Sequence, residues 1–136
     1  MLTIDKLNFQ LNIRLRNTTT VRSIVIETIM RKEDFIYPIF VVEGKDVKNV
    51  IASMPGVFQL SLDHFAAEID EVVSLGIPSI ILFGIPNEKD AVGSGAYASE
   101  GIVQKATRFA KERHPGLVVI ADTCLCQYTN HGHCGI

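Results

Sequence analysis

Three short apolar segments alternate with two amphipathic segments between residues 36 and 121, and this alternation limits the folds open to the chain. The apolar segments are Ile36 to Val42, Ser79 to Phe83 and Leu117 to Ala121, and they are rich in β-branched residues. Short, nearly continuous apolar runs are typical of strands that are buried on both faces. The order strand, helix, strand, helix, strand therefore predicts a parallel sheet with helices outside it.

The two amphipathic segments carry apolar residues at helical spacing and have recognisable ends. The first runs from Leu62 to Val73; Ser61 can cap its start, and Gly76 suits the left-handed position after its end. The second runs from Ile102 to Ala110 and stops before Pro115. Functional sites in such folds gather at the carboxyl ends of the strands. The residues after position 121 are therefore the first place to look for chemistry.

The beginning of the chain does not share this pattern. Asn8 to Thr20 mixes arginines and threonines without a sustained period, whereas Val21 to Met30 predicts a short helix. Two interpretations stay open for this part of the chain. It is either an arm that lies on another subunit or a frayed terminus.

All three cysteines of the chain lie directly after the third apolar segment, together with an acid and two histidines. The group comprises Asp122, Cys124, Cys126, His131, His133 and Cys134. Thiolate and imidazole are ligands that zinc prefers. Three thiols leave a tetrahedral ion one position short, and an open position distinguishes catalytic zinc sites from closed structural ones.

Three other interpretations of the cysteines are weaker than metal binding. Single cysteines are often small buried hydrophobes, but three in so short a stretch are hard to explain by packing. A disulfide would leave an odd thiol, and nothing in the sequence indicates secretion. A C-x-C redox pair would leave Cys134 and the histidines unexplained. The spacing C-x-C-x7-C is also not a common zinc-finger pattern.

Composition places the chain in a broad class. With 136 residues, 47% of them hydrophobic, the chain has the size of one domain and enough apolar material for a core. The net charge of −2 indicates neither a nucleic-acid footprint nor a basic membrane patch. The first residues carry charge where a signal peptide would be apolar, and no apolar run is long enough to span a bilayer. We therefore expect a cytoplasmic protein, in which free thiols and metal ligation are stable.

Several stretches of the sequence match the pattern of a known enzyme family. They are Asp34 to Gly44, Ser53 to Val57, Leu75 to Ile77, Leu82 to Gly84, Lys89 and Asp90, and Asp122 to Gly135. On these stretches the chain resembles porphobilinogen synthase, also called 5-aminolaevulinate dehydratase. The resemblance implies the α/β class and a (β/α)8 barrel, represented here by its first three strands and two helices. It also implies that residues 1–33 form an N-terminal arm and that residues 34–136 form the N-terminal part of the barrel.

The resemblance also implies a reaction and a set of site residues. The family condenses two molecules of 5-aminolaevulinate to porphobilinogen, with loss of two waters, in tetrapyrrole (haem) biosynthesis. Cys124, Cys126 and Cys134 match the zinc ligands of its zinc-dependent members, and Asp122 matches an active-site acid. Zinc is thus the implied cofactor, with a magnesium ion left open as a second one. The implied partners are the substrate and further copies of the chain, an octamer in the family, with no nucleic acid and no membrane. The family's usual Thr-Ser-His is Thr129-Asn130-His131 here.

One part of the family's chemistry has no counterpart among the residues of this sequence. The family uses a lysine that forms a Schiff base with the substrate and a second lysine beside it, both well downstream of the cysteines. The seven lysines here do not fit that role: Lys6, Lys32, Lys45, Lys48, Lys89, Lys105 and Lys111. A barrel of this kind needs about 250 residues. We therefore expect the N-terminal portion of the enzyme, inactive alone; the alternatives are a non-catalytic zinc-binding or assembly fragment and, more weakly, a thiol redox module.

A portion of a barrel also raises an expectation about assembly. Three parallel strands cannot close a barrel, so both outer strands should lack a neighbour. The inner face expected to be uncovered comprises Ile39, Val41, Ile81, Phe83, Val118 and Ile120. The chain alone is therefore not expected to be a stable monomer.

Overall fold

The computed structural model describes residues 15–134, which form two units that separate between Arg31 and Lys32. The described part of the first unit, residues 15–31, includes the helix α2 (Thr19–Val25), and none of the residues of this helix is buried. Thr18 caps it, because its hydroxyl accepts a hydrogen bond from the Val21 amide at 3.1 Å. The helix is shorter than the predicted span from 21 to 30, since Ile26 already has extended backbone angles. Residues 1–14 of the predicted arm lie outside the described part, and its docking on another subunit stays a prediction.

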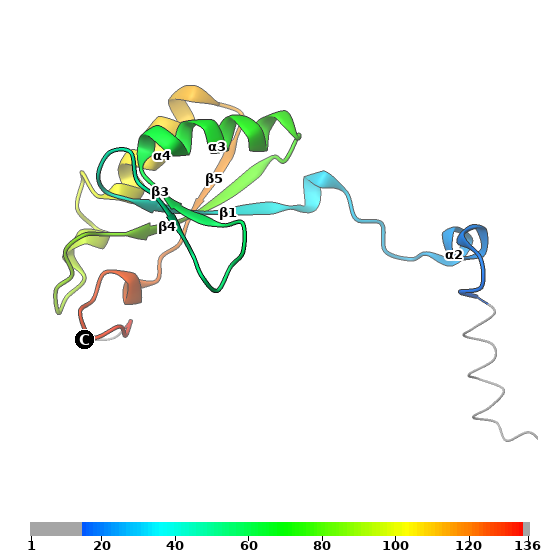
Figure 1. The fold of residues 1–136 in the computed structure, drawn as a ribbon, viewed down its shortest axis with the longest axis horizontal. Helices are drawn as coiled ribbons and strands as arrows, with labels where there is room; N and C mark the ends of the chain where they lie inside the picture. The colour runs from blue at the N-terminus through cyan, green and yellow to red at the C-terminus, as the bar shows by residue number, and fades with distance from the viewer. Residues whose placement is uncertain (1–14, 135–136) are drawn as a thin grey trace, which may run out of the picture. The chain divides into compact units, whose positions relative to one another are not determined.

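The second unit is a five-stranded sheet with helices on one face (Figure 1). Its strands are β1 (Ile36–Val42), β2 (Lys48–Val50), β3 (Phe58–Leu60), β4 (Ser79–Ile85) and β5 (Val118–Ala121). Its helices are α3 (Leu62–Ser74) and α4 (Ile102–Arg113), with short 3-10 turns η1 (Lys32–Asp34), η2 (Ser94–Ala96) and η3 (Leu125–Gln127). The sheet order is β2-β3-β1-β4-β5; β1, β3, β4 and β5 run parallel, and β2 is antiparallel to β3. The predicted alternation of strands and helices is confirmed.

The core lies between the sheet and the two helices. Ile39 of β1 and Ile80 and Leu82 of β4 pack there against Phe65 of α3 and Ala106 of α4, and all five are 2% exposed or less. Burying each large aliphatic or aromatic side chain contributes about 1.5–3 kcal/mol to folding. This apolar layer holds α3 and α4 on the sheet.

The opposite face of the sheet carries the alternate residues of the same strands. Phe40 of β1 stacks on Phe83 of β4 with ring centroids 5.1 Å apart, and both side chains are half-buried. Because side chains alternate along a strand, Ile39 and Val41 point to the helices and not to this face. The expectation that Ile39 and Val41 line the inner face is therefore wrong, whereas Ile81 and Phe83 do share it.

The ends of α3 show one prediction confirmed and one corrected. Gly76 has a φ of +76°, and the amides of Gly76 and Ile77 donate to the carbonyls of Val73 and Val72, which is a Schellman motif. Ser61 does occupy the position before the helix, but its hydroxyl makes no cap hydrogen bond. It instead accepts from the Val47 amide at 2.8 Å, so it fastens the loop after β1.

The two short strands β2 and β3 were not predicted from the sequence. β3 pairs with the end of β1, where Phe40 and Val41 face Gln59 and Leu60. The outer edge of β1 is therefore partly covered, contrary to the expectation that it lacks a neighbour. Within residues 15–134, the outer edge of β5 has no paired strand. None of the described helices is long and apolar enough to cross a membrane.

Candidate metal centre

The cysteine group follows β5 directly, at the carboxyl end of the parallel sheet. The Asp122 amide still donates to the Leu82 carbonyl of β4 at 3.2 Å, so the residue before the cysteines is fixed by the sheet. The chain then turns through η3, where the amides of Tyr128 and Thr129 both donate to the Leu125 carbonyl. The predicted position of the group at a strand end is therefore confirmed.

The three thiols converge on one point. The Sγ atoms of Cys124 and Cys126 are 2.8 Å apart, those of Cys126 and Cys134 are 2.8 Å apart, and those of Cys124 and Cys134 are 3.1 Å apart. The sulfurs therefore belong to a group whose ligand atoms all lie within 4.8 Å of one another. Asp122 and the two histidines are not members of that group. Three thiols suit a borderline-soft ion such as zinc, and they leave its fourth position for a ligand from elsewhere.

Hydrogen bonding within the cluster distributes its protons unevenly. Bonds from Cys126 and then Cys124 lower the pKa of Cys134 to about 7, because they stabilise a thiolate at that sulfur. Contacts with Cys124 and then Cys134 raise the pKa of Cys126 to about 12. Since a thiolate is the form that binds metal, these bonds favour the metal-binding form at Cys134.

The carboxylate of Asp122 is held by two N–H donors beside the thiols. Its Oδ1 accepts from the Cys124 amide at 3.3 Å, and its Oδ2 accepts from Nε2 of Gln127 at 2.7 Å. Gln127 was not singled out in the sequence, because a glutamine between a cysteine and a tyrosine carries no recognisable pattern. Its contact with Asp122 depends on the tight turn of η3.

The histidines of the motif lie outside the thiol cluster and have other contacts. Nε2 of His131 lies 3.2 Å from the Ala91 carbonyl, and Nδ1 of His131 accepts from the His133 amide at 3.3 Å. The two imidazoles stack with centroids 6.0 Å apart. The two histidines are close to the cysteines in the sequence, but in the structure their contacts stabilise the cysteine loop.

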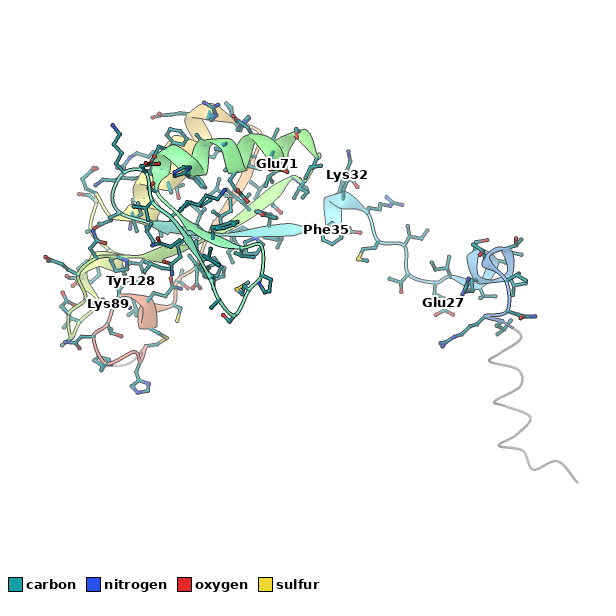
Figure 2. All side chains as sticks on the ribbon, viewed as in Figure 1. Glu27, Lys32, Phe35, Glu71, Lys89 and Tyr128 are labelled. Carbon is teal, nitrogen blue, oxygen red and sulfur yellow. The ribbon has the colours of Figure 1, made fainter. Side chains whose placement is uncertain are left out.

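The loop after β4 supports the cysteine loop. The Asp90 carbonyl accepts from the Asn130 amide at 2.9 Å, and the Asp90 amide donates to Tyr128 at 3.3 Å. Hydrogen bonds from the hydroxyl and then the amide of Ser94 hold the pKa of the Asp90 carboxyl below its usual range. Figure 2 shows Tyr128 and Lys89 at the same end of the second unit. The loop after one strand thus positions the loop after the next.

A cavity of about 250 Å³ adjoins the thiols and the acid. Asp122, Cys124 and Leu125 line one side of it, and Tyr97 and Gln104 are among its other lining residues. It is large enough for a small organic molecule and places an apolar wall beside a carboxylate. Tyr128 also lines it, and burial followed by the Asp122 charge raises the pKa of that phenol.

The described lysines lie away from this cavity. Lys111 donates to the Leu117 carbonyl at 2.9 Å, at the start of β5 and so at the opposite end from Asp122. Lys48 lies over the Phe58 ring at 4.5 Å, and Lys105 is exposed on α4. Lys89 lines a separate cavity of about 400 Å³ with Glu43 and other residues of the loops after β1 and β4. None of the lysines in residues 15–134 lies among the residues that line the cavity at Asp122.

The sequence is similar to one family over almost its whole length. A sequence model of delta-aminolevulinic acid dehydratase matches residues 10–136. The dehydratase of Halalkalibacterium halodurans is 61% identical over 130 residues, which cover 96% of this chain and 40% of that protein. The dehydratase of Staphylococcus epidermidis is 53% identical over the same shares. The chain thus spans about 40% of the length of these curated relatives.

The fold is similar to a solved member of the same family. The crystal structure of the Toxoplasma gondii enzyme, in complex with its reaction product porphobilinogen, superposes with a TM-score of 0.83 at 31% identity. The similarity covers 91% of this chain and 36% of that chain. The predicted fold class is confirmed, since the sheet and its helices are part of a (β/α)8 barrel. The chain belongs to the delta-aminolevulinic acid dehydratase family.

Proposed function

We propose that this chain provides the metal-binding part of a porphobilinogen synthase active site. The reaction joins two molecules of 5-aminolaevulinate into porphobilinogen with loss of two waters. The observation that carries the proposal is the convergence of three thiols beside Asp122, at the carboxyl end of β5. Catalytic groups of (β/α)8 enzymes occupy that end of the barrel.

Cys124, Cys126 and Cys134 would hold the zinc ion. When bound there, zinc would supply Lewis-acid chemistry to a carbonyl or amine group of the substrate. Three thiolates around a divalent ion give the site a formal charge of about −1. That negative charge lowers the Lewis acidity of the ion. The site would therefore favour binding and orientation of a substrate over strong activation of water.

Asp122 would act as the acid–base group of the site. Its two carboxylate oxygens each accept one N–H, so the group is fixed in orientation at the wall of the cavity. A carboxylate in this position can accept a proton from a substrate and return it, provided that the reacting atom comes within hydrogen-bond distance. The apolar part of the same wall limits the access of water to that exchange.

The Schiff-base lysines of the reaction would come from another stretch of polypeptide. None of the lysines in residues 15–134 lines the cavity at Asp122, and the chain spans about 40% of the length of its curated relatives. We further propose a cytoplasmic homo-oligomer, with magnesium as an additional ion. The exposed apolar residues of the first unit support assembly, because Ile24, Ile29 and Met30 are 66–76% exposed.

A non-catalytic assembly role is the second candidate. It is favoured by the inner face of the sheet, where Phe40 and Phe83 are only half-buried, and by the edge of β5, which has no paired strand within the described part of the chain. In that case the chain would bind zinc without contributing to turnover.

Metal analysis and substrate binding test the proposal together. The purified chain should bind about one zinc per chain, whereas Cys126→Ala and Cys134→Ala should each weaken binding at least about ten-fold. The zinc-loaded chain should bind 5-aminolaevulinate in a calorimeter, and removal of zinc with a chelator should abolish that heat. Asp122→Asn provides a control that retains zinc.

Two results would contradict this function. Unchanged zinc content in a variant that lacks all three thiols would remove the metal site. Zinc binding without any zinc-dependent binding of 5-aminolaevulinate would favour the assembly role instead. Borohydride should not trap 5-aminolaevulinate on the chain, and a trapped adduct located at Lys45 or Lys89 would show that the lysines were misjudged.

A further inference from the structure

The hydrogen bond between Gln127 and Asp122 gives the glutamine a role at the metal centre. We propose that Gln127 is a positioning residue that holds the Asp122 carboxylate away from the ion, so that the fourth ligand position stays open to an incoming molecule. This inference rests on the proposed function, because it presupposes that the thiol cluster binds metal. It differs from that function in assigning a task to a residue that contacts neither the thiols nor, in our proposal, the substrate.

Asp122 is a natural competitor for the open position. Carboxylate oxygens are competent zinc ligands, and three thiols leave one position to be filled. Asp122 stands two residues before Cys124, and its Oδ1 already lies 3.3 Å from the Cys124 amide. Yet its oxygens are not among the ligand atoms that converge within 4.8 Å. Hydrogen bonds from the Cys124 amide and from Nε2 of Gln127 hold this carboxylate where it is.

The histidines of the motif are weaker competitors than Asp122. His131 uses both of its ring nitrogens, since Nδ1 accepts from the His133 amide and Nε2 faces the Ala91 carbonyl at 3.2 Å. That pair of contacts assigns the proton to Nε2. His133 stacks on the ring of His131 and is also absent from the converging group.

Gln127 provides the stronger of the two contacts that restrain Asp122. Its Nε2 donates to Oδ2 at 2.7 Å, and a carboxylate only accepts, so the amide must face it with nitrogen. In this orientation Oε1 of Gln127 is buried and has no hydrogen-bond partner within residues 15–134. The effect of the Gln127 contact falls on the position of the carboxylate.

The backbone of Gln127 is itself fixed, so the restraint is rigid. Gln127 ends η3, and the next residue, Tyr128, is 5% exposed. The Tyr128 amide donates to Leu125 at 2.9 Å. A side chain mounted on such an anchored turn can hold a neighbouring group in one place.

Gln104 offers a matched control within the same cavity. Its Nε2 donates to the Ala96 carbonyl at 2.8 Å, and its Oε1 is likewise buried with no partner among the described residues. It lines the cavity together with Asp122 and Cys124 but does not bond to the acid. Gln104→Met thus removes an equivalent amide hydrogen bond while leaving Asp122 restrained.

The test titrates imidazole into the cobalt(II)-loaded chain, since cobalt accepts the ligands of zinc and its visible absorption changes with the fourth ligand. Gln127→Met keeps the length of the side chain and removes its donor. We expect its dissociation constant for imidazole to rise about ten-fold, because Asp122 then occupies the position. Adding Asp122→Asn to Gln127→Met should restore the wild-type constant, whereas any change caused by Gln104→Met, which alters only the cavity lining, should not be reversed by Asp122→Asn. Circular dichroism of each variant checks that the fold is retained.

The outcomes separate this inference from the proposed function. If the wild-type chain binds cobalt and imidazole but Gln127→Met binds imidazole equally well, the positioning role is wrong and the metal site stands. Loss of cobalt binding in Gln127→Met, or failure of Asp122→Asn to restore imidazole binding, would show a merely structural role and would also overturn it. Absence of cobalt binding by the wild-type chain would overturn both.

Discussion

Arg113 at the end of α4 donates two hydrogen bonds to Asp70 on α3, from Nε at 2.7 Å and from Nη2 at 2.5 Å. The same carboxylate lies 2.7 Å from Nε2 of His114. The two helices that cover the sheet are thereby joined by a forked ion pair as well as by their apolar faces. The pair lies on the outer surface, away from the cysteines.

The Asp70 contact predicts a pH-dependent contribution to stability. Hydrogen bonds from Arg113 and then His114 hold the pKa of Asp70 well below its usual range. Because the folded state binds the proton less well than the unfolded state, the contribution is present above the unfolded pKa of about 3.9 and is lost as the pH falls through and below it. Asp70→Asn should lower the melting temperature at pH 7 by no more than a few degrees, since the two side chains are 45% and 41% exposed.

Thermal melts of wild type and Asp70→Asn between about pH 7 and pH 2 measure this effect. The two curves should converge at the acid end. Glu112→Gln, which removes another negative charge from an exposed position near the end of α4, should leave the melting temperature almost unchanged. A difference between wild type and Asp70→Asn that grows as the pH falls would contradict the assignment.

Tyr37 should titrate abnormally for a different reason. Its hydroxyl donates to Glu68 at 2.7 Å, and that bond, followed by burial, raises the pKa of Tyr37 to about 12. The neutral phenol is favoured in the fold, so this contact stabilises the protein below the unfolded pKa of about 10 and is lost as the pH rises towards 12. The pKa of Tyr128 is raised as well, so the titration is done in a Tyr128→Phe background, where ultraviolet absorption should show one late tyrosine that Tyr37→Phe removes. Glu68→Gln should bring it back towards 10, and a late tyrosine that persists in both variants would refute the contact.

The two faces of the sheet should respond differently to truncation. Phe65 is fully buried under the sheet, so Phe65→Ala should destabilise the chain by about 3–5 kcal/mol. Phe40 is half-buried on the opposite face, so Phe40→Ala should lower the free energy of unfolding by less, about 1–2 kcal/mol. Urea unfolding of both variants, with wild type as reference, gives the comparison. Equal losses would mean that the inner face is as well covered as the core.

Long apolar runs and specific spacing made much of this fold predictable. The strand Ile36–Val42 was predicted with its observed bounds, because a short apolar run that is rich in β-branched and aromatic residues favours a buried strand. The Schellman glycine at position 76 and the thiol cluster were also predictable, since each depends on residues close together in the chain. The zinc ion itself stays a prediction.

Other features depend on contacts that no local pattern encodes. β2 contains three exposed residues and β3 only three residues in all, so neither shows a strand period. The Ser61 hydroxyl accepts a hydrogen bond from the Val47 amide instead of capping the helix, because the loop after β1 passes close to Ser61. The hydrogen bonds of Asp90 to the cysteine loop likewise join segments that are distant in sequence. Tertiary contacts, which the sequence pattern does not contain, decided each of these cases.

The open edge of β5 and the inner face of the sheet predict self-association. β3 protects part of the β1 edge, but among the described residues β5 has no outer neighbour, and Val118 is 53% exposed. Unpaired backbone beside apolar side chains favours pairing with another chain. Sedimentation of the purified chain should therefore show oligomers or aggregates whose fraction rises with concentration. Ile120→Lys, which places a charge on the inner face, should shift the distribution towards monomer, whereas Lys105→Glu on the exposed side of α4 should not. A compact 15.0 kDa monomer that unfolds cooperatively at every concentration would contradict this, because the edge would then have to be covered within a single chain.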